Sequence, residues 1–291
     1  MFVNSGAELI EICKEKNQSI WEYTIDVEVE NTGLSREKVI EKMQKTLEVM
    51  KQSAQYGMDN KVKSVSGLIG GDAHKLYEYA KKGNTLTGDL MVKAMARALS
   101  SSEVNAAMGR IVACPTAGSC GILPAAVISA GEKLNKSDDE LVKALFTASG
   151  VGIIIAKNAT LAGAEGGCQA ECGSAAAMAA AAIVELMGGT VAQALSAGAI
   201  VLKNILGLVC DPVAGLVEVP CAKRNAAGVV SALTSAELAI AGIESKIPFD
   251  ETVAAMYKVG RQLPMELRET ALGGLATTPT GLRLNKEIFG K

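Results

Sequence analysis

Cysteine is the residue type in this sequence that carries the clearest chemical signal. The seven cysteines are Cys13, Cys114, Cys120, Cys168, Cys172, Cys210 and Cys221. Their odd number disfavours a disulfide framework and favours metal binding or catalysis. Cys168 follows a glycine pair, and glycines let the backbone come close to a bulky group. Cys210 and Cys221 bracket a loop that holds prolines and a glycine, so these three cysteines are candidate metal ligands.

Thiolate is the form of cysteine that binds metal, and the local sequence favours it at two positions. We expect helices to begin just after Cys168 and at Cys221, and a helix N-terminus stabilises negative charge. Three thiolates around an iron–sulfur cluster would leave one iron without a protein ligand, free to act as a Lewis acid on a hydroxyl or carboxylate. Spacing alone leaves the ligand set open, because Cys172 shares a helical face with Cys168, and Cys114 and Cys120 are further candidates.

The composition argues against several functional classes. With 29 basic and 31 acidic side chains the net charge is −2, and aromatic residues make up only 3% of the chain, which disfavours a nucleic-acid-binding surface. The mean hydropathy is +0.24, but the two long uncharged runs, 111–131 and 186–202, are interrupted by glycines, prolines or polar residues, so we expect no membrane span. The first residues have no apolar core, which predicts a cytoplasmic protein without a signal peptide.

Helices must position the cysteines, because helical signals recur along the chain. Ser19 with Glu22 and Ser137 with Glu140 have the spacing of capping boxes. In the first half of the chain, helices are expected from Ser5 to Lys16, from Ser19 onward, from Ser35 to about Gln55, from Ala73 to Lys82, from Gly88 to about Met108, and in a segment that ends at about Leu134. In the second half, helices are expected from Ser137 to Asn158, from Gln169 to Met187, from Thr190 to about Leu206, from Cys221 to about Ala241, and from Asp250 to Pro264. We expect Gly57 to end the third of these helices, and Thr87 and Asp250 to cap the helices that follow them. The pattern predicts a mainly α protein, a single all-helical domain over residues 1–291 with residues 1–60 packed on it as a helical N-terminal region.

Three loops contain unusually many glycines and other small residues: 61–73, 113–124 and 268–279. Backbone N–H groups in such loops can face an anion, so we expect the loops to converge on the metal-cluster site, with tight helix packing as the alternative. The sequence lacks the phosphate-binding pattern G-x-x-x-x-G-K-[ST], a G-x-G-x-x-G after a strand, and the hydrolase pattern G-x-S-x-G. The lone His74 cannot form a multi-histidine metal site and is expected to be a surface or packing residue.

Five motifs, in order along the chain, give the sequence a resemblance to a known family. They are residues 66–72 (SGLIGGD), 114–125 (CPTAGSCGILPA), 157–171 (KNATLAGAEGGCQAE), 210–221 (CDPVAGLVEVPC) and the loop from Glu269 to Gly274. With them the chain resembles the α subunit of the iron–sulfur-dependent L-serine dehydratases (L-serine ammonia-lyases) over nearly its whole length. The resemblance implies an all-helical fold, in agreement with the pattern above, and a lyase that converts L-serine to pyruvate and ammonia.

The resemblance also implies a cofactor and a set of site residues. Cys168, Cys210 and Cys221 would hold a [4Fe–4S] cluster with one open iron, and the other four cysteines would be small buried residues. The implied substrate loop is Ser66, Gly70, Gly71 and Asp72, with Thr116 and Ser119 close by. Lys157 and Asn158 are the candidates for proton transfer and substrate orientation.

The chain departs from that family in two places. It lacks the Ser-His-Thr motif that single-chain relatives carry in a further domain, so we expect a separate β subunit to supply it in a heterodimer. The sequence leaves open which of the two subunits supplies the base that removes the α-proton. Residues 285–291 hold no cysteine that could cover the open iron. The expected role is amino-acid degradation that feeds gluconeogenesis, with L-serine as the small-molecule partner.

Other functions compete with this interpretation. A pyridoxal-phosphate dehydratase would need a Schiff-base lysine and a phosphate loop in a sheet-containing fold, and neither signature is found. An iron–sulfur lyase acting on another small amino acid, as in cysteine desulfidation, would share the cluster. A non-catalytic iron–sulfur electron carrier would require four thiolate ligands. An alanine-rich helical interaction protein would hold its cysteines incidentally.

Overall fold

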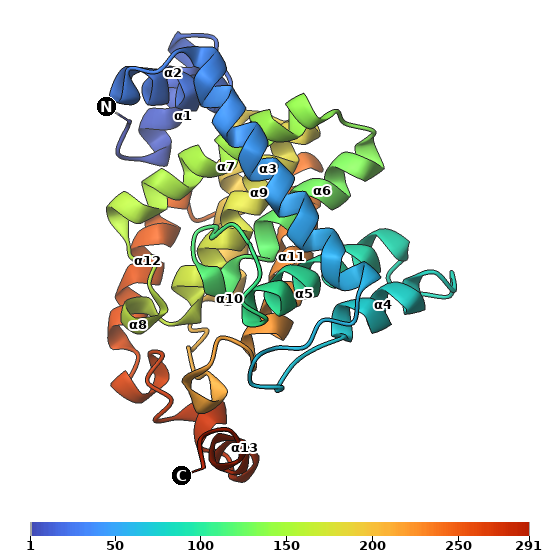
Figure 1. Cartoon of the computed structure of the whole chain (residues 1–291). Helices are drawn as coiled ribbons and strands as arrows, with labels where there is room; N and C mark the ends of the chain where they lie inside the picture. Colours follow the sequence, from blue (N-terminus) through green and yellow to red (C-terminus); the bar gives the residue numbers. More distant parts are fainter. Residues whose placement is uncertain (1, 291) are drawn as a thin grey trace.

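The structure, a computed structural model, describes residues 2–290, and helices make up most of this part of the chain (Figure 1). The α-helices within it are α1 (Gly6–Glu15), α2 (Ile20–Thr32), α3 (Arg36–Asp59), α4 (Asp72–Ala80), α5 (Asp89–Ala106), α6 (Ile122–Leu134), α7 (Asp138–Asn158), α8 (Gly163–Gly166), α9 (Ser174–Leu186), α10 (Val191–Ile205), α11 (Cys221–Ile240), α12 (Phe249–Gln262) and α13 (Pro279–Phe289). Over these described residues no β-strand is assigned, and extended backbone pairs only in two isolated bridges. The prediction of a mainly α, single-domain fold is confirmed.

Helix α9 lies in the middle of the core because its side chains are small and apolar on every side. Its alanines between Ala175 and Ala182 are fully buried. A helix without a polar face must be covered all round, and α6, α7, α10 and α11 all contact α9 (Figure 1). Because α9 begins directly after Cys172 and Gly173, the packing of this helix anchors the cysteine segment in the centre of the molecule.

Local capping signals place six of the thirteen α-helix starts in residues 2–290. The residues that stand at N-cap positions and accept a bond from a backbone N–H three residues later are Ser5, Ser19, Ser35, Ser137, Thr190 and Thr278. Both predicted capping boxes are present, with the Ser19 N–H donating to Glu22 at 2.9 Å and the Ser137 N–H donating to Glu140 at 2.8 Å. These caps satisfy N–H groups that a helix start leaves without partners.

Two predicted helix boundaries are wrong. Helix α3 continues through Gly57 to Asp59. A Cβ atom at Gly57 would lie 2.8 Å from the Oγ of Ser100, and the Gly57 N–H donates to that oxygen at 2.7 Å. The glycine therefore permits a close approach of α3 to α5 rather than ending a helix. Thr87 does not cap α5, because Gly88 occupies the N-cap position without a side-chain cap.

The expectation that Asp250 caps its own helix is also wrong, because Pro248 stands at the N-cap position of α12. The Asp250 carboxylate instead accepts from the Gly6 N–H at 2.6 Å and the Ala7 N–H at 3.0 Å, at the start of α1. A side chain from the last part of the chain thus caps the first helix. Helix α13 lies outside the predicted set, although Thr278 caps it.

None of the helices in residues 2–290 combines the length and the apolar character that crossing a membrane requires. The uncharged run 111–131 is divided between a loop and α6. The run 186–202 is divided between the end of α9, a turn and α10.

Candidate metal centre

The segment with Cys168 and Cys172 forms a π-helical turn, η2 (Gln169–Gly173), between α8 and α9. Such turns are rare and occur frequently at functional sites. The amide of Gln169, 1% exposed, holds the turn. It donates to one backbone carbonyl of α8 and one of α12, both at 2.9 Å, and accepts from a backbone N–H before Cys210 at 2.9 Å. The turn brings the sulfur atoms of Cys168 and Cys172 to 3.3 Å from each other.

Cys210 and Cys221 stand at the two ends of the loop between α10 and α11, which we call the cysteine loop (210–221). The Cys210 N–H donates to the Leu267 carbonyl at 2.8 Å, and the Cys210 carbonyl accepts from the Glu269 N–H at 2.7 Å. Cys221 is the first residue of α11, as expected. Both cysteines are buried, at 3% and 8% exposure. The cysteine loop is therefore paired with the C-terminal glycine-rich loop.

Arg224, one turn into α11, holds the cysteine loop with both arms of its guanidinium. Its Nη1 donates to the Val209 carbonyl at 2.8 Å, and its Nη2 pairs with the Asp211 carboxylate at 2.8 Å. Asp211 also accepts from the Leu275 N–H at 2.8 Å, and its side chain is 4% exposed. One buried ion pair thus joins α11, the cysteine loop and the C-terminal glycine-rich loop.

The cysteines of the two segments influence one another's charge. Hydrogen bonds from the Cys172 and Cys210 thiols, aided by the positive charge of Arg224, hold the pKa of Cys168 well below its usual range. The interaction with Cys168 and then burial raise the pKa of Cys210. Burial and then the charge on Cys168 raise the pKa of Cys221 to about 12. The Cys168 thiol thus contacts those of Cys172 and Cys210, and Cys221 stands at the other end of the cysteine loop.

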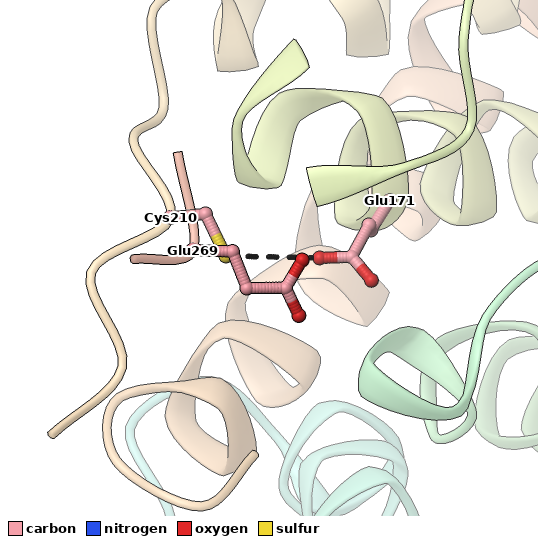
Figure 2. A group of neighbouring side chains, drawn as sticks. All are labelled: Glu171, Cys210 and Glu269. Atoms are coloured by element: carbon pink, nitrogen blue, oxygen red, sulfur yellow. Dashed lines mark hydrogen bonds between the residues drawn. The ribbon is translucent and has the colours of Figure 1, made fainter. Parts of the chain in front are cut away.

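Two carboxylates stand beside Cys210 (Figure 2). One ligand atom each from Glu171, Cys210 and Glu269 lies within 4.8 Å of the other two, and the Cys210 thiol donates to Glu171 Oε2 at 3.8 Å. Glu171 is 9% exposed, and burial raises the pKa of its carboxyl to about 7 against the lowering effect of a hydrogen bond from Thr116. Sequence reasoning missed both glutamates as site residues, although both lie in motifs that it singled out.

Glycines let two loops approach this cysteine–carboxylate group closely. A Cβ atom at Gly163 would lie 2.5 Å from Glu171 Oε2 and 3.1 Å from Cys210 Sγ. A Cβ atom at Gly118 would lie 3.2 Å from Glu171 Oε1. A side chain at position 163 would therefore displace the Glu171 carboxylate and crowd the Cys210 sulfur.

The glycine-rich loop 61–73 is bound to the cysteine loop by a side-chain hydrogen bond. Ser66 Oγ donates to Glu218 Oε2 at 2.8 Å, and Glu218, 5% exposed, belongs to the cysteine loop. The carboxylate of Asp72 forms an ion pair with Lys223 of α11. The predicted substrate loop therefore contacts both the cysteine loop and the helix that follows it.

Gly70 and Gly71 lie where this loop turns into α4. Both have positive φ, +156° and +70°, and a Cβ atom at Gly70 would lie 2.5 Å from the Val62 carbonyl oxygen. Glu103 of α5, 1% exposed, holds the turn, because its Oε1 accepts from the first two backbone N–H groups of α4 at 2.6 and 3.3 Å. Sequence reasoning missed Glu103, whose role depends on this tertiary contact.

Thr116 and Ser119 of the loop 113–124 stand beside the cysteine–carboxylate group. Thr116 Oγ1 donates to Glu171 Oε1 at 2.8 Å and lies 3.1 Å from Ser119 Oγ. Asn225 of α11 clamps the same loop by donating to one of its backbone carbonyls at 2.7 Å and accepting from one of its N–H groups at 2.8 Å. Thr116 therefore contacts Glu171 directly, and Ser119 contacts Thr116.

Lys157 and Asn158, at the end of α7, bind the N-terminal segment. The Lys157 ammonium donates to the backbone carbonyls of Phe2 at 2.5 Å and Val3 at 3.2 Å. Asn158 Nδ2 donates to the Asn4 carbonyl at 2.6 Å. The structure thus places these two side chains against the chain start, apart from the contacts that join the cysteines and the glycine-rich loops.

The three remaining cysteines are buried, as predicted. Burial raises the pKa of Cys13 to about 11 and that of Cys120 to about 12, and it also raises the pKa of Cys114. The Cys114 thiol donates to the Cys120 carbonyl at 3.6 Å. These thiols stay protonated and pack as small apolar side chains.

Comparisons with known proteins agree with this geometry. A sequence model of the family described as serine dehydratase alpha chain matches residues 15–276. The chain belongs to the serine dehydratase alpha chain family. It is 53% identical over 283 residues to a Bacillus subtilis protein named probable L-serine dehydratase, alpha chain, with 97% of this chain and 94% of that protein covered. It is 49% identical over 287 residues to the L-serine dehydratase, alpha chain, of Peptoniphilus asaccharolyticus, with 99% and 98% covered.

Some relatives of this chain are longer proteins. The Escherichia coli protein named L-serine dehydratase TdcG is 42% identical over 182 residues, which are 62% of this chain and 40% of that protein. It therefore contains sequence beyond the shared part. The whole site described above, from Ser66 to Leu275, lies inside the stretch that matches the serine dehydratase alpha chain family.

Proposed function

We propose that this chain is the alpha subunit of an L-serine dehydratase, a lyase of amino-acid degradation that converts L-serine to pyruvate and ammonia. The observation that carries the proposal is the buried group formed by Cys168, Cys172, Glu171 and Cys210, which come from segments far apart in the sequence, with Cys221 at the other end of the cysteine loop. The names of the relatives, all of them L-serine dehydratases, support the substrate and the reaction class. Groups with perturbed pKa values cluster at functional sites, which also supports the proposal.

The cofactor we propose is a [4Fe–4S] cluster held by Cys168, Cys210 and Cys221. The donor set fits, because iron–sulfur clusters are held by cysteine thiolates and Arg224 supplies a positive charge beside Cys168. The absence of a side chain at Gly163 keeps space beside the Cys210 sulfur. When bound with three protein ligands, the cluster supplies a Lewis-acidic iron for the hydroxyl of serine.

We propose that the glycine-rich loops bind and orient the rest of the substrate. The residues assigned to this task are Ser66, Gly70, Gly71 and Asp72, with Thr116 and Ser119. Backbone N–H groups at a glycine turn suit a carboxylate, and the charge of Asp72 suits an ammonium group. Supporting contacts are the hydrogen bonds of Ser66 to Glu218 and of Thr116 to Glu171, which tie these hydroxyl residues to the cysteine-bearing segments.

We place the base that removes the α-proton in a beta subunit rather than at Lys157 or Asn158. The Lys157 ammonium donates to two backbone carbonyls at the chain start, which directs it away from the cysteines. The name alpha chain carried by relatives supports a partner, and longer relatives contain additional sequence. The proposed enzyme is therefore a heterodimer of this chain and a beta subunit.

The proposal is tested on the complex of this chain with its beta subunit, purified without oxygen. Iron, acid-labile sulfide and the rate of pyruvate formation from L-serine are measured for the wild type, Cys168→Ala and Cys13→Ala. We expect the wild type and Cys13→Ala to hold iron and form pyruvate, and Cys168→Ala to lose both. A wild type without iron, or a Cys168→Ala variant with unchanged activity, would end the proposal.

The same preparation separates the rival functions. L-cysteine replaces L-serine in a parallel assay, and released sulfide is measured. Faster turnover of L-cysteine would replace the proposed substrate while keeping the cluster. Full iron content without turnover of either amino acid would favour an electron carrier.

A further inference from the structure

Cys172 is a buried thiol that the proposed function does not use. Its sulfur lies 3.3 Å from that of Cys168, and each residue is 2% exposed. The other thiols outside the proposed ligand set make different contacts: Cys114 and Cys120 donate to backbone carbonyls. The Cys168–Cys172 contact has hydrogen-bond geometry, and the Cys168 sulfur also interacts with the Cys210 thiol.

The surroundings favour Cys172 over Cys210 as a covalent partner for Cys168. The Cys210 thiol is directed at the Glu171 carboxylate, to which it donates at 3.8 Å. Cys172 shares one short turn with Cys168, and glycines flank this turn on both sides, at Gly167 and Gly173. Closing a disulfide requires the two sulfurs to move from 3.3 Å to about 2.0 Å, a local adjustment of the turn.

We propose that Cys168 and Cys172 are a redox pair that closes to a disulfide when the chain meets peroxide without its cluster. The sulfur of Cys168 attacks hydrogen peroxide, the O–O bond breaks, and Cys168 becomes a sulfenic acid with release of one water. The sulfur of Cys172 then attacks the sulfenic sulfur, the S–O bond breaks, and the second water leaves as the disulfide forms. The two thiols lose two electrons and two protons, and one peroxide is reduced to two waters.

The disulfide has two consequences for the chain. It removes Cys168 from the ligand set, so a new cluster cannot assemble until a thiol reduces the bond. It also stops the oxidation of Cys168 at a reversible stage, since sulfinic and sulfonic acids are not restored by thiols. These consequences rest on the proposed function, whereas formation of the bond itself does not.

Mass spectrometry tests the bond directly. The complete alpha–beta complex is freed of iron with a chelator under anaerobic conditions, treated with hydrogen peroxide and alkylated, and peptides are mapped for wild type, Cys172→Ala, Cys172→Ser and Cys13→Ala. We expect the wild type and Cys13→Ala to lose two hydrogens in the peptide with Cys168 and Cys172, which become alkylatable only after reduction. In both Cys172 variants, Cys168 should instead gain two or three oxygens.

Three results would overturn the proposal. The first is a wild-type Cys172 that remains open to alkylation while Cys168 is oxidised. The second is a disulfide from Cys168 to Cys210 or Cys221. The third is the same Cys168 product in the wild type and in the Cys172 variants. None of these readings depends on activity, so they stand even if the chain fails to form pyruvate.

A reloading assay tests the consequence. Peroxide-treated complexes are given iron and sulfide with or without dithiothreitol, and cluster absorbance is recorded. We expect the wild type to regain its cluster only with dithiothreitol, and the Cys172 variants to stay without it in both cases. Equal recovery of wild type and Cys172→Ser with dithiothreitol would contradict a protective role for Cys172.

Discussion

At the scale of single residues, the ion pair of Arg224 with Asp211 decides whether the cysteine loop keeps its place. Asp211 is nearly fully buried, and Arg224 also binds the Val209 carbonyl next to Cys210. Removing one partner of a buried pair leaves the other charge uncompensated. The pair thus links the stability of the chain to the position of a proposed ligand.

Replacing Arg224 should therefore cost both stability and cofactor. For Arg224→Met we expect the free energy of unfolding in urea to fall by about 3–5 kcal/mol and the iron content per chain to drop. Arg224→Met/Asp211→Asn should regain part of the stability, because neither charge remains. The exposed pair Arg283–Glu287 offers a control, since Arg283→Met should cost at most about 1 kcal/mol. Equal losses for the single and the double variant would show that the ion pair does not hold the loop.

Glu103 makes stability depend on pH. Burial raises the pKa of its carboxyl above the ordinary value of 4.5, and its Oε2 has no partner among the described residues. The folded chain then binds this proton more tightly than the unfolded chain, so its stabilising effect is complete at low pH and is lost as pH rises through the raised pKa. We expect the free energy of unfolding to fall less between pH 5 and pH 8 in Glu103→Gln than in wild type. Glu11→Gln on the surface of α1 should keep the wild-type slope, and identical slopes for all three proteins would refute the assignment.

At the scale of elements, local start signals explain several of the helices that the sequence predicted correctly. Ser19 and Ser137 satisfy backbone groups within their own first turn, so four adjacent residues are enough to place the helix. Asp250 misled the prediction because its partners, at the start of α1, lie 244 and 243 residues away. The prediction for Gly57 was wrong because the role of this glycine depends on α5, which packs against it.

The close crossing of α3 and α5 gives a prediction at this scale. Gly57→Ala places a Cβ atom 2.8 Å from Ser100 Oγ and 3.0 Å from Ser100 Cα, so we expect a loss of about 1–3 kcal/mol in unfolding free energy, although alanine favours helices by about 1 kcal/mol. At Gly173 the nearest heavy atom to such a Cβ is 3.6 Å away, and Gly173→Ala should be neutral or stabilising. Chemical denaturation of both variants checks this. Gly57→Ala as stable as wild type would mean that α3 and α5 can separate without cost.

The candidate site was only partly predictable from sequence. Composition and spacing marked the cysteines but left the ligand set open, and the resemblance to a family selected Cys168, Cys210 and Cys221. Glu171 and Glu269 were not predicted as site residues, because the sequence of a motif does not show whether its glutamate faces a buried thiol. Lys157 looked suitable for proton transfer by type, yet its contacts at the chain start are visible only in the fold.

At the scale of the whole molecule, the site is assembled from segments between Ser66 and Leu275 that meet only when the chain is folded. The buried helix α9 anchors the π-helical turn, α11 carries Cys221 with Arg224 and Asn225, and loops from both halves of the chain close around them. The site therefore depends on long-range packing as well as on local sequence.

The most direct test of the central claim is a Mössbauer spectrum of the anaerobic alpha–beta complex, recorded with and without L-serine. We expect about four irons per alpha chain, as a [4Fe–4S] cluster requires, and a change on adding L-serine in the signal of one iron alone. Iron content should fall in Cys168→Ala, Cys210→Ala and Cys221→Ala but not in Cys13→Ala. A spectrum that L-serine leaves unchanged, or iron that survives all three ligand substitutions, would contradict the account.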